Sequence, residues 1–245
     1  MKENQTEEQN GNKKNLPKGI HRGLKLQDLI IVLIGVLVTL GYTIGNKQYT
    51  DYKTRKNLIN ELRTSLKEDI KYIDYVLAVA DTITYSLDNV FSISEYSEKD
   101  FSKLNDEYID TLVHYTSHSL GFRPNMSVFE AYKYNGDLKL LESKFLTKLF
   151  YLYDYYYVRI FCYLESNQSV ISQIDNYLVD NAKYIGRSKY SYSIKADKET
   201  LKNLLKDEKY KQLLNINGVT VEMLIFALTT AKEEIEKLMI LLDDF

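Results

Sequence analysis

Residues 58–87 read LINELRTSLKEDIKYIDYVLAVADTITYSL, and the spacing of their apolar side chains decides the fold class. Apolar residues recur there at intervals of three, four or seven, which places them on one face of an α-helix. They are Leu58, Leu62, Leu66, Ile70, Ile73, Leu77, Ala80 and Leu87. No proline lies between Pro17 and Pro124. We therefore expect one long helix that starts upstream and forms a stalk at the start of a folded domain.

The remainder of the chain also favours helices. Its 245 residues include only 10 glycines and 2 prolines, too few for the many tight turns of a β-sandwich, a barrel or an α/β sheet. A shorter helix is expected where apolar and aromatic residues recur at Leu104, Tyr108, Leu112 and Tyr115, and a longer one over 138–164. The predicted fold is all-α, a helical bundle over residues 47–245.

Two local patterns predict helix boundaries. Ser127 and Glu130 form an S-x-x-E capping box, in which each side chain accepts a hydrogen bond from the other residue's backbone N–H. Gly136 suits the left-handed conformation that ends a helix, and Asp137 can cap the next helix. We therefore expect a short helix that begins near residue 127 and ends at Gly136.

The C-terminal part of the chain carries a heptad seam. Apolar residues step by four, three, four, three and four at Leu224, Leu228, Ala231, Ile235, Leu238 and Leu242. Packing inside the same bundle is the expected use of a seam of almost three heptads. A homo-oligomer that forms through the seam or the stalk is the alternative.

The apolar run LIIVLIGVLVTLGYTIGN, residues 29–46, predicts a single transmembrane helix. Its 18 residues carry no charge, and about 17 apolar residues suffice to cross the hydrocarbon core. A cleaved signal peptide fits less well, because the preceding polar tail is long and no A-x-A-like site follows. A buried core helix is the other alternative. The expected organisation is a disordered basic tail over 1–28, the span over 29–46 and the helical domain over 47–245.

Charge leaves the orientation of this span open. Lys and Arg are almost equally frequent on its two flanks, so the positive-inside rule does not choose a side. The cations that follow the span could touch anionic lipid headgroups; they are Lys47, Lys53, Arg55, Lys56 and Arg63. The net charge of −2 excludes a globally basic nucleic-acid binder but not a local basic patch.

No catalytic motif is present, and neither an enzyme nor a cofactor is expected. The sequence lacks a P-loop, G-x-S-x-G, a kinase signature and G-x-G-x-x-G. His114 and His118, one helical turn apart, could share a metal ion with Asp110 and Glu107, which leaves a metal-dependent hydrolase as the weakest hypothesis. The single cysteine, Cys162, allows no internal disulfide, and we expect it to be a buried small hydrophobe.

One window combines cations with aromatic rings. Residues 182–196, AKYIGRSKYSYSIKA, hold four Lys or Arg residues and no acid, and Gly186 and the serines favour a loop or a short extended piece. Single-stranded nucleic acid is commonly bound by cations that track its phosphates and by aromatic faces that stack on its bases. The candidate nucleic-acid-binding residues are Lys183, Tyr184, Arg187, Lys189, Tyr190, Tyr192 and Lys195.

The 22 tyrosines are the chain's most unusual compositional feature. Residues 150–161, FYLYDYYYVRIF, distribute five tyrosines around a full helical circumference, so some must face the core and others must not. Tyrosine suits wet interfaces and base stacking, although AT-rich coding would also produce this composition.

The order of parts resembles the AbiP family of lactococcal abortive infection proteins, which confer phage resistance. The resemblance is carried by the anchor LQDLIIVLIGVLVTLGYTIGN after a short basic tail and by the helical, Lys- and Tyr-rich remainder. The segment 127–157 also resembles uncharacterised bacterial single-pass membrane proteins. The AbiP resemblance implies a cytosolic domain, sequence-independent binding of RNA and single-stranded DNA, and no catalysis. The leading hypothesis is therefore a membrane-anchored phage-defence protein that binds single-stranded nucleic acid, and the alternative is an oligomeric scaffold or sensor that recruits a protein partner.

Overall fold

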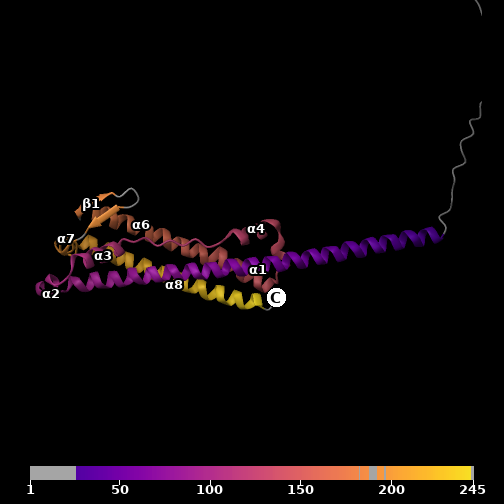
Figure 1. Cartoon of the computed structure of the whole chain (residues 1–245), viewed down its shortest axis with the longest axis horizontal. Helices are drawn as coiled ribbons and strands as arrows, with labels where there is room; N and C mark the ends of the chain where they lie inside the picture. Colours follow the sequence, from indigo (N-terminus) through magenta and orange to yellow (C-terminus); the bar gives the residue numbers. More distant parts are fainter. Residues whose placement is uncertain (1–25, 182, 188–191, 196, 244–245) are drawn as a thin grey trace, which may run out of the picture. The chain divides into compact units, whose positions relative to one another are not determined.

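The computed structural model describes residues 26–181, 183–187, 192–195 and 197–243, and for residue 26 and the two strands it describes the backbone. The chain divides into two compact units, 1–50 and 51–245. The elements follow the order α1 (Leu26–Ser94), α2 (Glu98–Ser102), α3 (Asp106–Thr116), α4 (Ser127–Asn135), the 3-10 helix η1 (Asp137–Leu140), α5 (Ser143–Tyr151), the π-helix η2 (Leu152–Tyr156), α6 (Tyr157–Asn181), β1 (Lys183–Arg187), β2 (Tyr192–Lys195), α7 (Lys198–Leu204) and α8 (Glu208–Asp243) (Figure 1). The described fold is helical apart from this one pair of short strands.

The long helix expected from the sequence is α1, whose 69 residues contain both the apolar run and the periodic stretch. In the first unit every described side chain from 27 to 50 is exposed, including Ile31 and Val38 at 67% and 66%. Two helices, α1 and α8, are long and apolar enough to cross a membrane by length and composition. The apolar window of α1 has none of its residues buried, whereas 39% of the window in α8 is buried.

In the second unit, α8 runs antiparallel to both α1 and α6. Three contacts set the α1–α8 alignment: the ion pairs Arg63–Asp243 at 3.0 Å and Lys232–Asp74 at 2.6 Å, and the position of Gly218 against Leu87. As residue numbers rise along α1, those of its partners fall along α8. Helices α6 and α8 pack along each other with the same opposed directions, since Asn167 contacts Asn217 and Tyr177 contacts Tyr210 (Figure 1).

The core of the second unit uses the predicted helix faces. All six residues of the C-terminal seam are buried within the chain, so packing in the same bundle is confirmed. Six of the eight residues in the α1 stripe are buried, and Ile70 and Leu77 pack at its edge. The buried amides of Asn167 and Asn217 join α6 to α8 at 2.9 Å, and Nδ2 of Asn217 donates to the Thr116 carbonyl of α3.

The predicted capping box is wrong. Met126 is the residue before α4, with no side-chain capping bond, and the Ser127 hydroxyl donates instead to Oδ1 of Asn125 at 2.6 Å. The serine is therefore occupied by a preceding side chain rather than by a backbone N–H. Gly136 ends α4 with φ of 74°, as predicted, because a residue without Cβ adopts this left-handed conformation without strain.

The helix predicted over 138–164 has different bounds. Asp137 begins the 3-10 helix η1 and makes no capping hydrogen bond, and α5 starts only at Ser143. From there the helical path continues through the π turn η2 into α6, and it ends at Asn181 rather than Leu164. The π turn places Tyr153 and Tyr157 in the core while Tyr151 stays 52% exposed, so the tyrosine run does face both ways.

One prediction about burial is wrong, and one predicted helix has a different buried face from its most regular spacing. Cys162 is exposed, because the core-facing side of α6 carries Tyr157, Ile160 and Asn167 and turns Cys162 away. In α3 the buried face consists of Ile109, Leu112, Val113 and Thr116. This is the short helix predicted from Leu104, Tyr108, Leu112 and Tyr115: Tyr108 and Tyr115 are half-buried, and Leu104 lies just before it.

Candidate nucleic-acid interface

Residues 183–187 and 192–195 of the basic and aromatic window form an antiparallel pair of strands between α6 and α7. Five of the seven predicted binding residues lie on it: Lys183, Tyr184 and Arg187 on β1, and Tyr192 and Lys195 on β2. Lys189 and Tyr190 lie outside the described residues. The extended backbone agrees with the prediction of a short extended piece around Gly186.

The register of this hairpin sets two lysines opposite each other at one end and an arginine opposite a tyrosine at the other. Lys183 pairs with Lys195 and Arg187 pairs with Tyr192, with an irregularity between Tyr184 and Gly186. Like charges at directly paired positions destabilise an antiparallel ladder. Cations and aromatic rings are the residue types by which single-stranded nucleic acid is commonly bound.

A cleft of about 590 Å³ lies between the end of α3 and the C-terminal half of α6. It is lined by His114 and Ser117 on one side and by Ser172, Asp175 and Asn176 on the other. Its volume is within the range of small-molecule pockets, and its polar groups can donate and accept hydrogen bonds. Asn176 precedes Lys183 by seven residues, so the cleft lies on the helix that leads into the hairpin.

Burial shifts the pKa of Asp175 in the cleft and that of His118, whose ring lies near His114. Burial raises the pKa of Asp175, against the opposing effects of a hydrogen bond from Ser117 and the nearby His114. Burial, with His114 as the second cause, lowers the pKa of His118. The two imidazole centroids lie 5.8 Å apart. Among the described residues no group of three or more potential metal ligands occurs, so the predicted set with Asp110 and Glu107 is not assembled there.

A second aromatic surface lies at the other end of α6. The exposed rings of Tyr151 and Tyr155 stack with centroids 4.7 Å apart, and the Arg159 guanidinium lies over Tyr163 and Phe226. About 36 Å of helix, at 1.5 Å per residue over Tyr157–Asn181, separates these rings from the hairpin. The tyrosine run and the basic window are therefore two surfaces, not one site.

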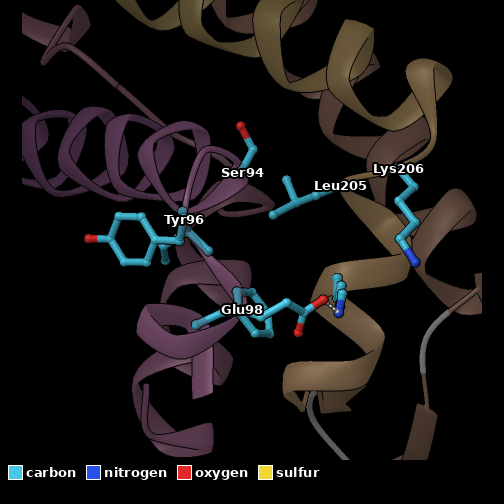
Figure 2. Close-up of a pocket in the computed structure, with 8 residues that line it drawn as sticks. Ser94, Tyr96, Glu98, Leu205 and Lys206 are labelled. Atoms are coloured by element: carbon cyan, nitrogen blue, oxygen red, sulfur yellow. Dashed lines mark hydrogen bonds and ion pairs between the residues drawn. The ribbon is translucent and has the colours of Figure 1, made fainter. Parts of the chain in front are cut away.

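A smaller pocket of about 160 Å³ lies where the end of α1 approaches α2 and α7 (Figure 2). Glu98 forms an ion pair with Lys202 there, and this lysine lowers the pKa of Glu98 (Figure 2). Because the glutamate neutralises one of the two lining lysines, Lys202 and Lys206, the pocket has little net charge to attract an ion.

Sequence reasoning missed the cleft because its walls come from segments about 60 residues apart. Asp175 and Asn176 have no motif around them, and the histidines had suggested carboxylate partners on their own helix. Only the packing of α3 against α6 brings Asp175 close to His114.

Comparison of the chain with protein-family models, with curated proteins and with solved structures finds no match. The resemblance to the AbiP family stays a prediction based on the order of parts.

Proposed function

We propose that this chain is a single-pass membrane protein of phage defence whose cytosolic helical domain binds single-stranded nucleic acid, RNA preferentially, without sequence specificity. The observation that carries the proposal is the hairpin, which pairs Lys183 with Lys195 and Arg187 with Tyr192. Phosphates bind between paired cations, and bases stack on the tyrosines.

The proposed binding surface is confined to the hairpin and does not extend over the whole domain. Residues 47–245 hold 26 Lys and Arg residues against 30 Asp and Glu residues, so the domain as a whole repels a polyanion. The window 182–196 contains four of those cations and no acid. Binding without base-edge recognition follows, because a phosphate contact carries no sequence information and every base has a face that can stack.

The apolar run of α1 supports the membrane part of the proposal. Eighteen uncharged residues with exposed apolar side chains require a nonpolar environment, and a bilayer provides one. The role in phage defence and the cytosolic orientation derive from the resemblance to the AbiP family.

Charge reversal tests the hairpin. A fluorescent single-stranded RNA is titrated with the full chain in nanodiscs and with the variant Lys183→Glu, Arg187→Glu, Lys195→Glu. We expect the variant to lose at least tenfold in affinity. The control reverses three exposed lysines elsewhere, Lys71, Lys139 and Lys144, and should lose much less. Equal losses in the two variants would remove the hairpin from the proposal.

A scaffold that binds a protein partner is the second candidate. The seam proposed for it is buried, but another face of α8 exposes Ile216, Val219, Met223 and Phe226 at 47–59%. These residues recur every three or four positions and form an apolar stripe. Light scattering at increasing protein concentration tests this candidate: an oligomer that is lost in the Met223→Gln, Phe226→Gln variant supports it, and a monomer at all concentrations contradicts self-association.

A further inference from the structure

A second basic site lies at the start of the second unit. Six residues of α1, at the helical spacing of one face, line a pocket of about 250 Å³ together with the last residues of α8. We call this the basic pocket; its lining residues are Tyr52, Arg55, Lys56, Ile59, Asn60, Arg63, Leu242 and Asp243. Three of them are cations, and Asp243 is the one acid in the lining.

Arg63 holds the two walls of the basic pocket together. Its Nη2 donates to the carbonyl of Leu242 at 2.8 Å and to Oδ1 of Asp243 at 3.0 Å. Its Nε–H is buried and has no acceptor among the described residues. A buried guanidinium N–H without an acceptor is costly, and an oxyanion in the pocket would satisfy it in the geometry that guanidinium favours.

The accessible charge lies beside this buried donor. Lys56 is exposed, and Arg63 is 28% exposed at its side chain, whereas Ile59, which also lines the pocket, is buried. Asp243 is 74% exposed, so it can move aside for a competing anion. The basic pocket therefore combines two cations that a ligand can reach with an apolar floor and a tyrosine.

The sequence places this pocket close to the bilayer. Tyr52 follows the last residue of the apolar run, Asn46, by six positions, and six residues of any conformation reach at most about 20 Å. Headgroups extend some 5–8 Å beyond each side of the hydrocarbon core, and long basic side chains reach back towards them. A tyrosine among juxtamembrane cations is typical of this interfacial layer.

We propose that the basic pocket binds the phosphate of an anionic phospholipid headgroup. The inference rests on the membrane part of the proposed function and adds a specific lipid partner. A phosphodiester oxygen accepts from Arg63 and Lys56, and Tyr52 lies along the glycerol or the first methylenes. A free phosphate shares this chemistry but lacks the apolar part that Ile59 and Tyr52 would contact.

Thermal unfolding of the full chain in dodecylmaltoside, followed by circular dichroism, tests the basic pocket. Dioctanoyl phosphatidylglycerol at one hundred times its dissociation constant should raise the Tm by about 5–10 °C. Dioctanoyl phosphatidylcholine, which is zwitterionic, and inorganic phosphate should leave the Tm within about 1 °C. A similar rise with phosphatidylcholine, or with inorganic phosphate, overturns the proposal of an anionic lipid.

Substitutions in the basic pocket test whether the rise in Tm comes from lipid bound there. Lys56→Gln, at an exposed position that does not threaten folding, should weaken phosphatidylglycerol binding about tenfold, and Asp243→Asn should strengthen it. Lys71→Gln, an exposed lysine further along α1, is the control and should change nothing. An unchanged phosphatidylglycerol response in Lys56→Gln overturns the assignment. The assignment is also overturned if single-stranded RNA displaces phosphatidylglycerol and Lys56→Gln weakens RNA binding.

Failure of this inference is distinguishable from failure of the proposed function. If the basic pocket does not bind a lipid phosphate, the phosphatidylglycerol response is absent. The chain then still resists alkaline extraction from membranes and still binds RNA through the hairpin. If the proposed function is wrong, alkaline extraction releases the chain from membranes or the titration shows no RNA binding. Either result is independent of whether phosphatidylglycerol raises the Tm.

Discussion

The hydroxyl of Tyr157 donates a 2.5 Å hydrogen bond to Oδ2 of Asp69, and this bond joins the first turn of α6 to the middle of α1. The second carboxyl oxygen, Oδ1, accepts from the backbone N–H of Asn125 at 2.7 Å. The Ser65 hydroxyl of α1 donates to the Asn125 carbonyl. Asp69 thus joins the loop before α4 to both α1 and α6.

This buried carboxyl predicts a specific dependence of stability on pH. Burial raises the pKa of Asp69, and the hydrogen bonds from Tyr157 and Asn125 offset the rise only in part. A group with a raised pKa in the folded state contributes stability below its unfolded pKa near 3.9 and loses it as pH increases through the folded value. Each unit of elevation costs about 1.4 kcal/mol at neutral pH.

The variant Asp69→Asn removes this titration. The free energy of unfolding is measured with urea at pH 4.5 and at pH 7.5. From the lower to the higher pH it should fall more in the wild type than in the variant, because other groups titrate equally in both proteins. The same difference between wild type and variant at both pH values would contradict the assignment of a raised pKa to Asp69.

The burial of the C-terminal seam predicts that its residues stabilise the monomer. Leu228 is completely buried, and Leu228→Ala should lower the free energy of unfolding by about 2–5 kcal/mol through lost burial and the cavity that remains. Ile240→Ala, on the same helix at 66% exposure, should change it by less than about 0.5 kcal/mol. Both measurements come from urea unfolding; similar losses in the two variants would contradict the seam's internal packing.

Helical periodicity predicted α1 and α8 well because each has a continuous apolar stripe with polar residues elsewhere. Around Cys162 the same reasoning failed, since VRIFCYLE is apolar on nearly all sides and offers no single face to bury. The capping box predicted at Ser127 does not form for a local reason, because the Ser127 hydroxyl donates to the Asn125 side chain instead. The partners of Asp69 and Asp175 come from elements far away in sequence, and no local spacing encodes them.

The exposure of Cys162 makes it a natural reporter of topology. As the single cysteine, it should react with a membrane-impermeant maleimide in the native state at a rate within tenfold of the unfolded chain. For a cytosolic domain, cells that express the chain should show labelling only after permeabilisation. Labelling of intact cells would place the domain outside, and Cys162→Ser reports any background.

The salt dependence of RNA binding tests the central claim most directly. Full-length protein in nanodiscs is titrated with a single-stranded RNA from 50 to 300 mM salt, alongside the variant Lys183→Gln, Arg187→Gln, Lys195→Gln. If these residues contact phosphates, the slope of log K against log salt concentration should become shallower by about 2 in the variant, at roughly 0.7 per lost contact. A slope and an affinity that are unchanged in the variant would contradict nucleic-acid binding by the hairpin.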